Sequence, residues 1–136
     1  IIWRNDASVF NQPPVAVDNI GVYCSTPSAP ANQATSLVLT PTSTSQINGS
    51  FTAATSAPTG YLTVRYPAGS AITNPTNSTT YTVGSSLGLG TVVAVGAATT
   101  FSATGLSGGT TYDFYVYDYF NAVYDFNLRN DIVFNV

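Results

Sequence analysis

The stretch LSGGTTYDFYVYDYF, residues 106–120, decides the fold class. Six of its last nine residues are aromatic, and successive side chains of a β-strand point to opposite faces. One face carries Asp118, which we expect to lie at the strand end or to meet an arginine, and three residues that we expect to point into a core: Tyr112, Phe114 and Val116. The other face carries Asp113 and three further tyrosines.

Those three tyrosines, Tyr115, Tyr117 and Tyr119, are predicted to form an outward-facing stripe. An exposed semi-apolar stripe often marks a contact with another protein, and a flat row of rings can stack on a sugar. Alternatively, the rings pack on the outer residues of a neighbouring strand, as cross-strand aromatic pairs do.

The rest of the chain repeats the signals of short β-strands. Runs rich in Thr, Ser, Val and Tyr alternate with Gly, Pro and Asn, and helix signals are almost absent. Turn signals every 8–12 residues are typical of an immunoglobulin-like sandwich. We therefore predict an all-β sandwich of about seven strands over residues 34–136. The runs before the opening stretch are 36–46, 47–54, 59–67, 79–84, 91–96 and 99–104.

The order of these motifs resembles a fibronectin type III module, in a variant common in large secreted bacterial proteins. Leu106 to Tyr112 matches the family's tyrosine corner, although Gly108 stands where the family usually has Pro. Phe51 stands where the family often has a buried Trp. The runs GYLTVR (60–65) and YTVGSSLGLGTVV (81–93) match its third strand and the variant's middle hairpin. The resemblance implies a fold but no particular function, because this sandwich hosts many functions.

Composition excludes several functions. Only 7% of the residues are charged, with 3 basic and 6 acidic side chains, no His and a net charge of −3. A Ser-His-Asp or Cys-His site needs His, and one Cys without His cannot hold zinc. Nucleic acid binding needs clusters of basic residues, which this sequence lacks. The sequence also contains no run of eighteen apolar residues, the length that a membrane-spanning helix needs. We therefore expect no enzyme, no cofactor and no catalytic or metal residue. Calcium is a weaker alternative at Asn5-Asp6 and Asp18-Asn19.

Residues 1–24 precede the sandwich as an N-terminal strand extension. They contain two strand-like runs, at 1–4 and 15–23, and resemble the closing strands of a jelly-roll domain. A two-stranded ribbon alone is marginal in water, so a neighbouring domain or subunit is expected to cover it. Residues 25–33 form a Pro/Ser-rich linker. The lone Cys24 is either a free thiol or a candidate inter-domain disulfide.

The C-terminal run NLRNDIVFNV ends the chain with apolar residues on one face: Leu128, Ile132, Phe134 and Val136. The simpler interpretation is the seventh strand of the sandwich. The alternative is a candidate inter-subunit strand donated to the next copy, since main-chain hydrogen bonds supply affinity in strand addition.

Together these features predict a non-enzymatic, extracellular structural or adhesive module. The expected context is a bacterial surface filament or fibre joined through terminal strands, and the expected partners are further copies or neighbouring domains. The alternative is a carbohydrate-binding or spacer module of a secreted enzyme, with glycans as partners. Because the chain does not begin with Met, we expect either a processed protein or part of a longer one.

Overall fold

The computed structural model describes residues 30–121, 123–124 and 132–135. In these ranges the chain forms strands in two antiparallel sheets and contains no helix. One sheet has the order β1-β2-β6. The other has the order β4-β5-β3-β7-β8, and β9 also pairs with β7. The strands are β1 (Thr35–Ser43), β2 (Gln46–Thr52), β3 (Gly60–Pro67), β4 (Ser86–Leu87), β5 (Gly90–Gly96), β6 (Thr100–Thr104), β7 (Thr111–Phe120), β8 (Val123–Tyr124) and β9 (Ile132–Asn135).

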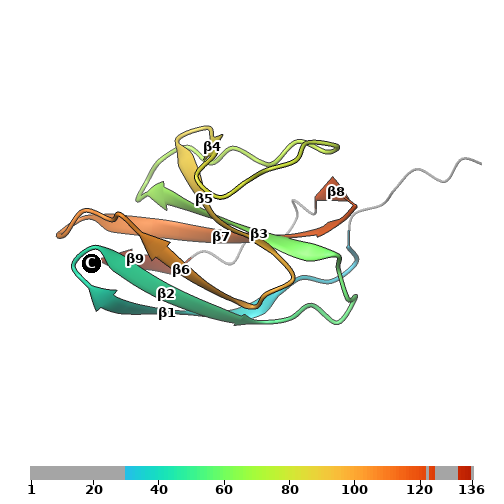
Figure 1. The fold of residues 1–136 in the computed structure, drawn as a ribbon, viewed down its shortest axis with the longest axis horizontal. Helices are drawn as coiled ribbons and strands as arrows, with labels where there is room; N and C mark the ends of the chain where they lie inside the picture. The colour runs from blue at the N-terminus through green and yellow to red at the C-terminus, as the bar shows by residue number, and fades with distance from the viewer. Residues whose placement is uncertain (1–29, 122, 125–131, 136) are drawn as a thin grey trace, which may run out of the picture.

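The two sheets face each other as layers (Figure 1). Seven of the strands have four or more residues, so the predicted all-β sandwich of about seven strands is confirmed. The longest, β7, lies within the aromatic-rich stretch 106–120. It pairs with β3 along eight residues, from Gly60↔Tyr119 to Pro67↔Tyr112.

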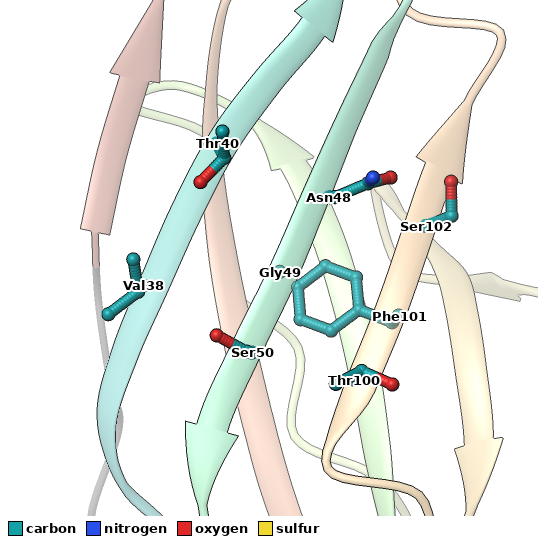
Figure 2. A pocket seen from close by; sticks show the side chains of 8 residues that line it. All are labelled: Val38, Thr40, Asn48, Gly49, Ser50, Thr100, Phe101 and Ser102. Atoms are coloured by element: carbon teal, nitrogen blue, oxygen red, sulfur yellow. The ribbon is translucent and has the colours of Figure 1, made fainter.

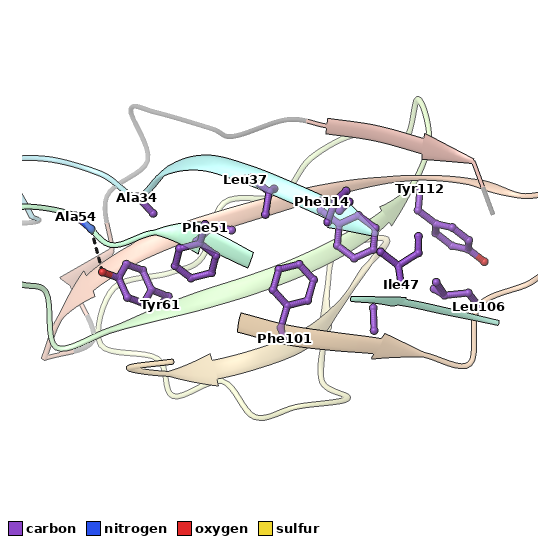
Figure 3. Packing of buried hydrophobic residues seen from close by; sticks show 13 residues of the cluster. Ala34, Leu37, Ile47, Phe51, Ala54, Tyr61, Phe101, Leu106, Tyr112 and Phe114 are labelled. Atoms are coloured by element: carbon purple, nitrogen blue, oxygen red, sulfur yellow. Dashed lines mark hydrogen bonds between the residues drawn. The ribbon is translucent and has the colours of Figure 1, made fainter. Parts of the chain in front are cut away.

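The main core lies between the sheets, and side chains of β2 point alternately into it and away from it. On β2, Ile47, Gly49 and Phe51 are buried while their neighbours in sequence are partly or fully exposed. Phe51 meets the ring of Tyr61 edge-on, with centroids 4.8 Å apart. Figure 3 shows these side chains converging from both sheets. The remaining members of the cluster are Ala34, Leu37, Leu39, Ala54, Phe101, Ala103, Leu106, Tyr112, Phe114 and Val116.

A second core lies on the opposite face of the β5-β3-β7 sheet. Its sheet residues are Leu62, Val64, Tyr66, Val92, Tyr115 and Tyr117. The segment between β3 and β5 covers them: Leu87 is buried in the cluster, and Ile72 and Tyr81 pack against it. This segment arches over the sheet at the top of Figure 1. The sheet is therefore packed on both faces, unlike an antiparallel sheet with one side in water.

The strand predicted at 79–84 is absent. Its residues have high β propensity, but the chain turns there: Ser85 N–H donates to the carbonyl of Thr82 at 3.0 Å, and Gly84 has a φ of +90°. The hairpin predicted within 81–93 does form, with Ser86 paired to Thr91 and Leu87 to Gly90. A Cβ at Gly90 would lie 2.5 Å from the ring of Tyr66, so only glycine allows this close approach.

Candidate interaction surface

The predicted tyrosine stripe is not a surface. Tyr115 is 6% exposed and Tyr117 is fully buried, while Tyr119 is partly buried against them. The alternation was right, because these rings do face away from the main core. Their exposure was wrong, because the segment between β3 and β5 folds over them. Tyr115 meets Tyr66 edge-on at 5.6 Å, which is the cross-strand packing given as the alternative.

Tyr66 fastens the covering segment to the sheet. Its hydroxyl lies 3.0 Å from the carbonyl oxygens of both Thr73 and Leu87, at the two ends of the covering arch. The amide of Thr73 also donates to the Tyr66 oxygen, at 3.4 Å. Burial raises the pKa of Tyr66 above its ordinary value of 10.0, although the Thr73 hydrogen bond acts the other way.

The raised pKa of Tyr66 predicts a loss of stability at alkaline pH. The neutral phenol can donate to a carbonyl and the phenolate cannot. Its stabilising contribution should therefore be complete below pH 10 and fall as the pH rises through the folded-state pKa. Urea unfolding between about pH 8 and about pH 12 checks this. Tyr66→Phe should be less stable at neutral pH and show a shallower alkaline decline; an unchanged slope would contradict the assignment.

The two described carboxylates lie on opposite faces of β7, as predicted, and both are buried. Asp113 accepts a hydrogen bond from the amide of Gly69 at 3.1 Å. Asp118 is fully buried and accepts from the amide of Ala34, at 3.0 and 3.3 Å from its two oxygens. The expectation that Asp118 ends the strand or meets an arginine is replaced by this contact, which holds the first residue of the sandwich. The two carboxylates do not form an acid/base pair.

Tyr112 forms the predicted corner. Ser107 N–H donates to its hydroxyl oxygen at 3.0 Å, and this hydrogen bond lowers the pKa of Tyr112. The guanidinium carbon of Arg65 lies 5.5 Å from the centre of the same ring. A cation at this distance over an aromatic face is attracted to it. The corner and the arginine therefore hold each other in place.

Tyr112→Phe should lower the free energy of unfolding by about 1 kcal/mol, because it removes one hydrogen bond and leaves the ring under Arg65. Urea denaturation measures the loss. Tyr112→Leu also removes the ring and should cost more. Equal stability of Tyr112→Phe and the native chain would show that the corner hydrogen bond is unimportant.

The outer face of the β1-β2-β6 sheet carries no charge. Val38 is 56% exposed there, and a shallow hollow of about 510 Å³ lies over the three strands. Figure 2 shows the side chains lining it. They are Val38, Thr40, Asn48, Ser50, Thr100 and Ser102, with Gly49 and Phe101 between them. Hydroxyl and amide groups of this kind can bind by hydrogen bonds but cannot perform acid/base chemistry.

The other predicted positions lie partly outside the described residues. Cys24, Leu128 and Val136 are not described. Within β9, the backbone of Ile132 pairs with Phe114 and that of Phe134 with Tyr112. The described part of the C-terminal run is thus a strand of its own sandwich, and donation to a second copy stays a prediction. Within the described part, no three acidic, His or Cys side chains cluster to hold a metal.

Neither a protein-family model nor a curated protein matches this sequence. Solved structures do match in shape. A fibronectin type III domain of human collagen XX aligns with a TM-score of 0.55 and 21% identity, over 82% of this chain and 100% of that one. The FN5 domain of Drosophila Lar aligns with a TM-score of 0.52 and 18% identity, over 80% and 95%.

The described residues have a fibronectin type III fold. Domains d3–d4 of rat CD45 also align, with a TM-score of 0.50 and 12% identity, over 98% of this chain and 80% of that one. The fibronectin type III fold accounts for the strand order and for the corner at Tyr112. None of the described residues forms a helix that could cross a bilayer.

Sequence reasoning missed three features of this fold. The second core is covered by residues that follow no regular period, and the Asp118 contact joins positions far apart in the chain. The surroundings of Arg65 depend on how the edges of the two sheets meet. Only the scarcity of charge signalled Arg65, since it is the one charged residue between Asp18 and Asp113.

Proposed function

We propose that this chain is a non-enzymatic, extracellular structural or adhesive module, acting as a subunit or repeat of a bacterial surface filament or fibre. The observation that carries the proposal is the path of the chain through the sandwich. Ala34 is held by Asp118, near the end of β7, whereas Asn135 pairs with Thr111, the first residue of β7. The sandwich thus begins and ends at opposite ends of its long axis (Figure 1).

The points where the chain enters and leaves the sandwich are far apart. Thr111 and Asp118 are seven positions apart on one strand, which corresponds to about 23 Å at about 3.3 Å per residue. Modules connected in line in this way transmit tension along their strands. The buried hydrogen bond at Ala34 supports such a role because it fixes the chain where it joins the sandwich.

The uncharged outer face supports self-association. Between Asp18 and Asp113 the chain has one charged residue, so most of this surface has little electrostatic repulsion to keep copies apart. The carbohydrate-binding alternative depended on an exposed tyrosine row. Tyr115 and Tyr117 are buried, so the described residues do not form that row.

Sedimentation velocity of the purified full chain over a range of concentrations tests the proposal, with negative-stain microscopy of the same samples. We expect association that increases with concentration, and elongated assemblies in the micrographs. A stable monomer at every concentration would contradict the filament proposal and leave the spacer alternative.

A further inference from the structure

A groove runs along one edge of the sandwich, where β6 of one sheet meets β5 of the other. Two hollows of about 230 and 260 Å³ lie there, and both are lined by Arg65 and Thr91. The first also contacts Ser102 and Thr104 of β6, and the second contacts Tyr112 at the corner. A half-buried arginine thus lies between two adjoining cavities.

Among the described residues, the guanidinium of Arg65 is positioned by an aromatic ring and not by a carboxylate. It lies over the ring of Tyr112, and within the described residues no ion pair joins it. The two described carboxylates are engaged elsewhere, Asp113 with Gly69 and Asp118 with Ala34. An oriented guanidinium suits a carboxylate, which it can bind through two parallel hydrogen bonds.

The groove also offers apolar contacts on both sides of the charge. Val83 lines one hollow and is 66% exposed; Leu89 lines the other and is 67% exposed. These are the two most exposed large hydrophobic residues in the described part of the chain. A fitting ligand therefore has a carboxylate with an apolar group on either side.

The edge of β6 can accept a further strand. In its sheet β6 is last in the order, with only β2 beside it among the described strands. Phe51 N–H donates to the carbonyl of Thr99, so these two opposite residues form a hydrogen-bonded pair. Hydrogen-bonded and non-hydrogen-bonded pairs alternate along an antiparallel ladder. The register places Ser102 opposite Asn48 in a non-bonded pair, so the backbone groups of Thr100, Ser102 and Thr104 point away from β2. An extended peptide can bind there by strand addition.

We propose that the groove binds the extended segment 15–23 of a second copy of this chain, with Asp18 on Arg65. In an extended segment, Asp18 shares a face with Ala16 and Ile20, which supply the two apolar groups. The other aspartates that the structure does not describe have a polar or charged residue at one or both of these flanking positions: Asp6, Asp125 and Asp131. This inference rests on the proposed self-association and names the contact that carries it.

Charge exchange between full-length chains tests this contact. Arg65→Asp and Asp18→Arg should each weaken association at least about tenfold, as loss of a close charge pair does. An equal mixture of the two variants should restore association, because each variant segment or groove then meets an opposite charge. Arg65→Gln replaces Arg65→Asp if the charge reversal prevents folding, and it should also weaken association. Arg4→Asp changes the net charge equally outside the contact and should associate like the native chain.

The outcomes separate this inference from the proposed function. If the native chain associates and neither single variant weakens it, the contact is wrong and the self-association stands. If the mixture stays dissociated while both changes in one chain restore association, the contact forms within one chain, which overturns the assignment to a second copy. A native chain that never associates contradicts both proposals.

Discussion

Asp118→Ala is expected to lower the free energy of unfolding by about 3 kcal/mol. The carboxylate is fully buried and accepts from the amide of Ala34, which is itself buried. Removing it leaves that donor without this partner and opens a cavity, and each effect costs about 1–3 kcal/mol. The chain at Ala34, just before β1, should then separate from β7.

Urea unfolding of full-length variants measures this loss. Asp118→Asn keeps an acceptor oxygen and should lose clearly less. Asn32→Ala removes an exposed hydrogen bond to Thr55 in the same part of the chain and should change stability by less than about 0.5 kcal/mol. If Asp118→Ala and Asn32→Ala unfold at the same urea concentration, Asp118 does not hold the sandwich as described.

Gly49→Ala is the second change with a large expected effect, about 3 kcal/mol of lost stability. A Cβ at this position would overlap three ring atoms of Phe101. That ring cannot easily move, because it stacks on Phe114 with centroids 5.7 Å apart in the main core. Overpacking of a filled core typically costs about 1–3 kcal/mol, and here the neighbour is a rigid ring.

The rescue of Gly49→Ala by a second change tests the cause. Phe101→Leu gives up ring contacts but makes room, so the double variant should be more stable than the sum of the two losses predicts. Ser50→Ala alters the next residue, on the exposed face of β2, and should be nearly neutral. Additive losses in the double variant would show that the ring is not the obstacle.

The sequence was sufficient where a face has a regular period. Alternation on β7 correctly predicted Tyr112, Phe114 and Val116 as core residues. The corner at Tyr112 was also predictable, because its hydrogen bond joins residues only five positions apart. Such local patterns are enough to specify a sandwich.

The second core could not be predicted in this way. Alternation shows that Tyr115 and Tyr117 share a face, but not what covers that face. Ile72, Tyr81 and Leu87, which cover it, follow neither a strand nor a helix period. The Asp118 contact spans 84 positions in sequence, so no local pattern announces it. The groove at Arg65 likewise depends on the relative position of two sheet edges.

Electron microscopy of the assembled native chain, at a resolution that separates strands, directly tests whether copies join through the β6 edge and Arg65. We expect sandwiches joined in line, with an extended segment beside β6 and density linking it to Arg65. Assemblies in which the β6 edge and Arg65 face solvent would contradict the proposed contact. Failure of the native chain to assemble at any concentration would contradict the structural function itself.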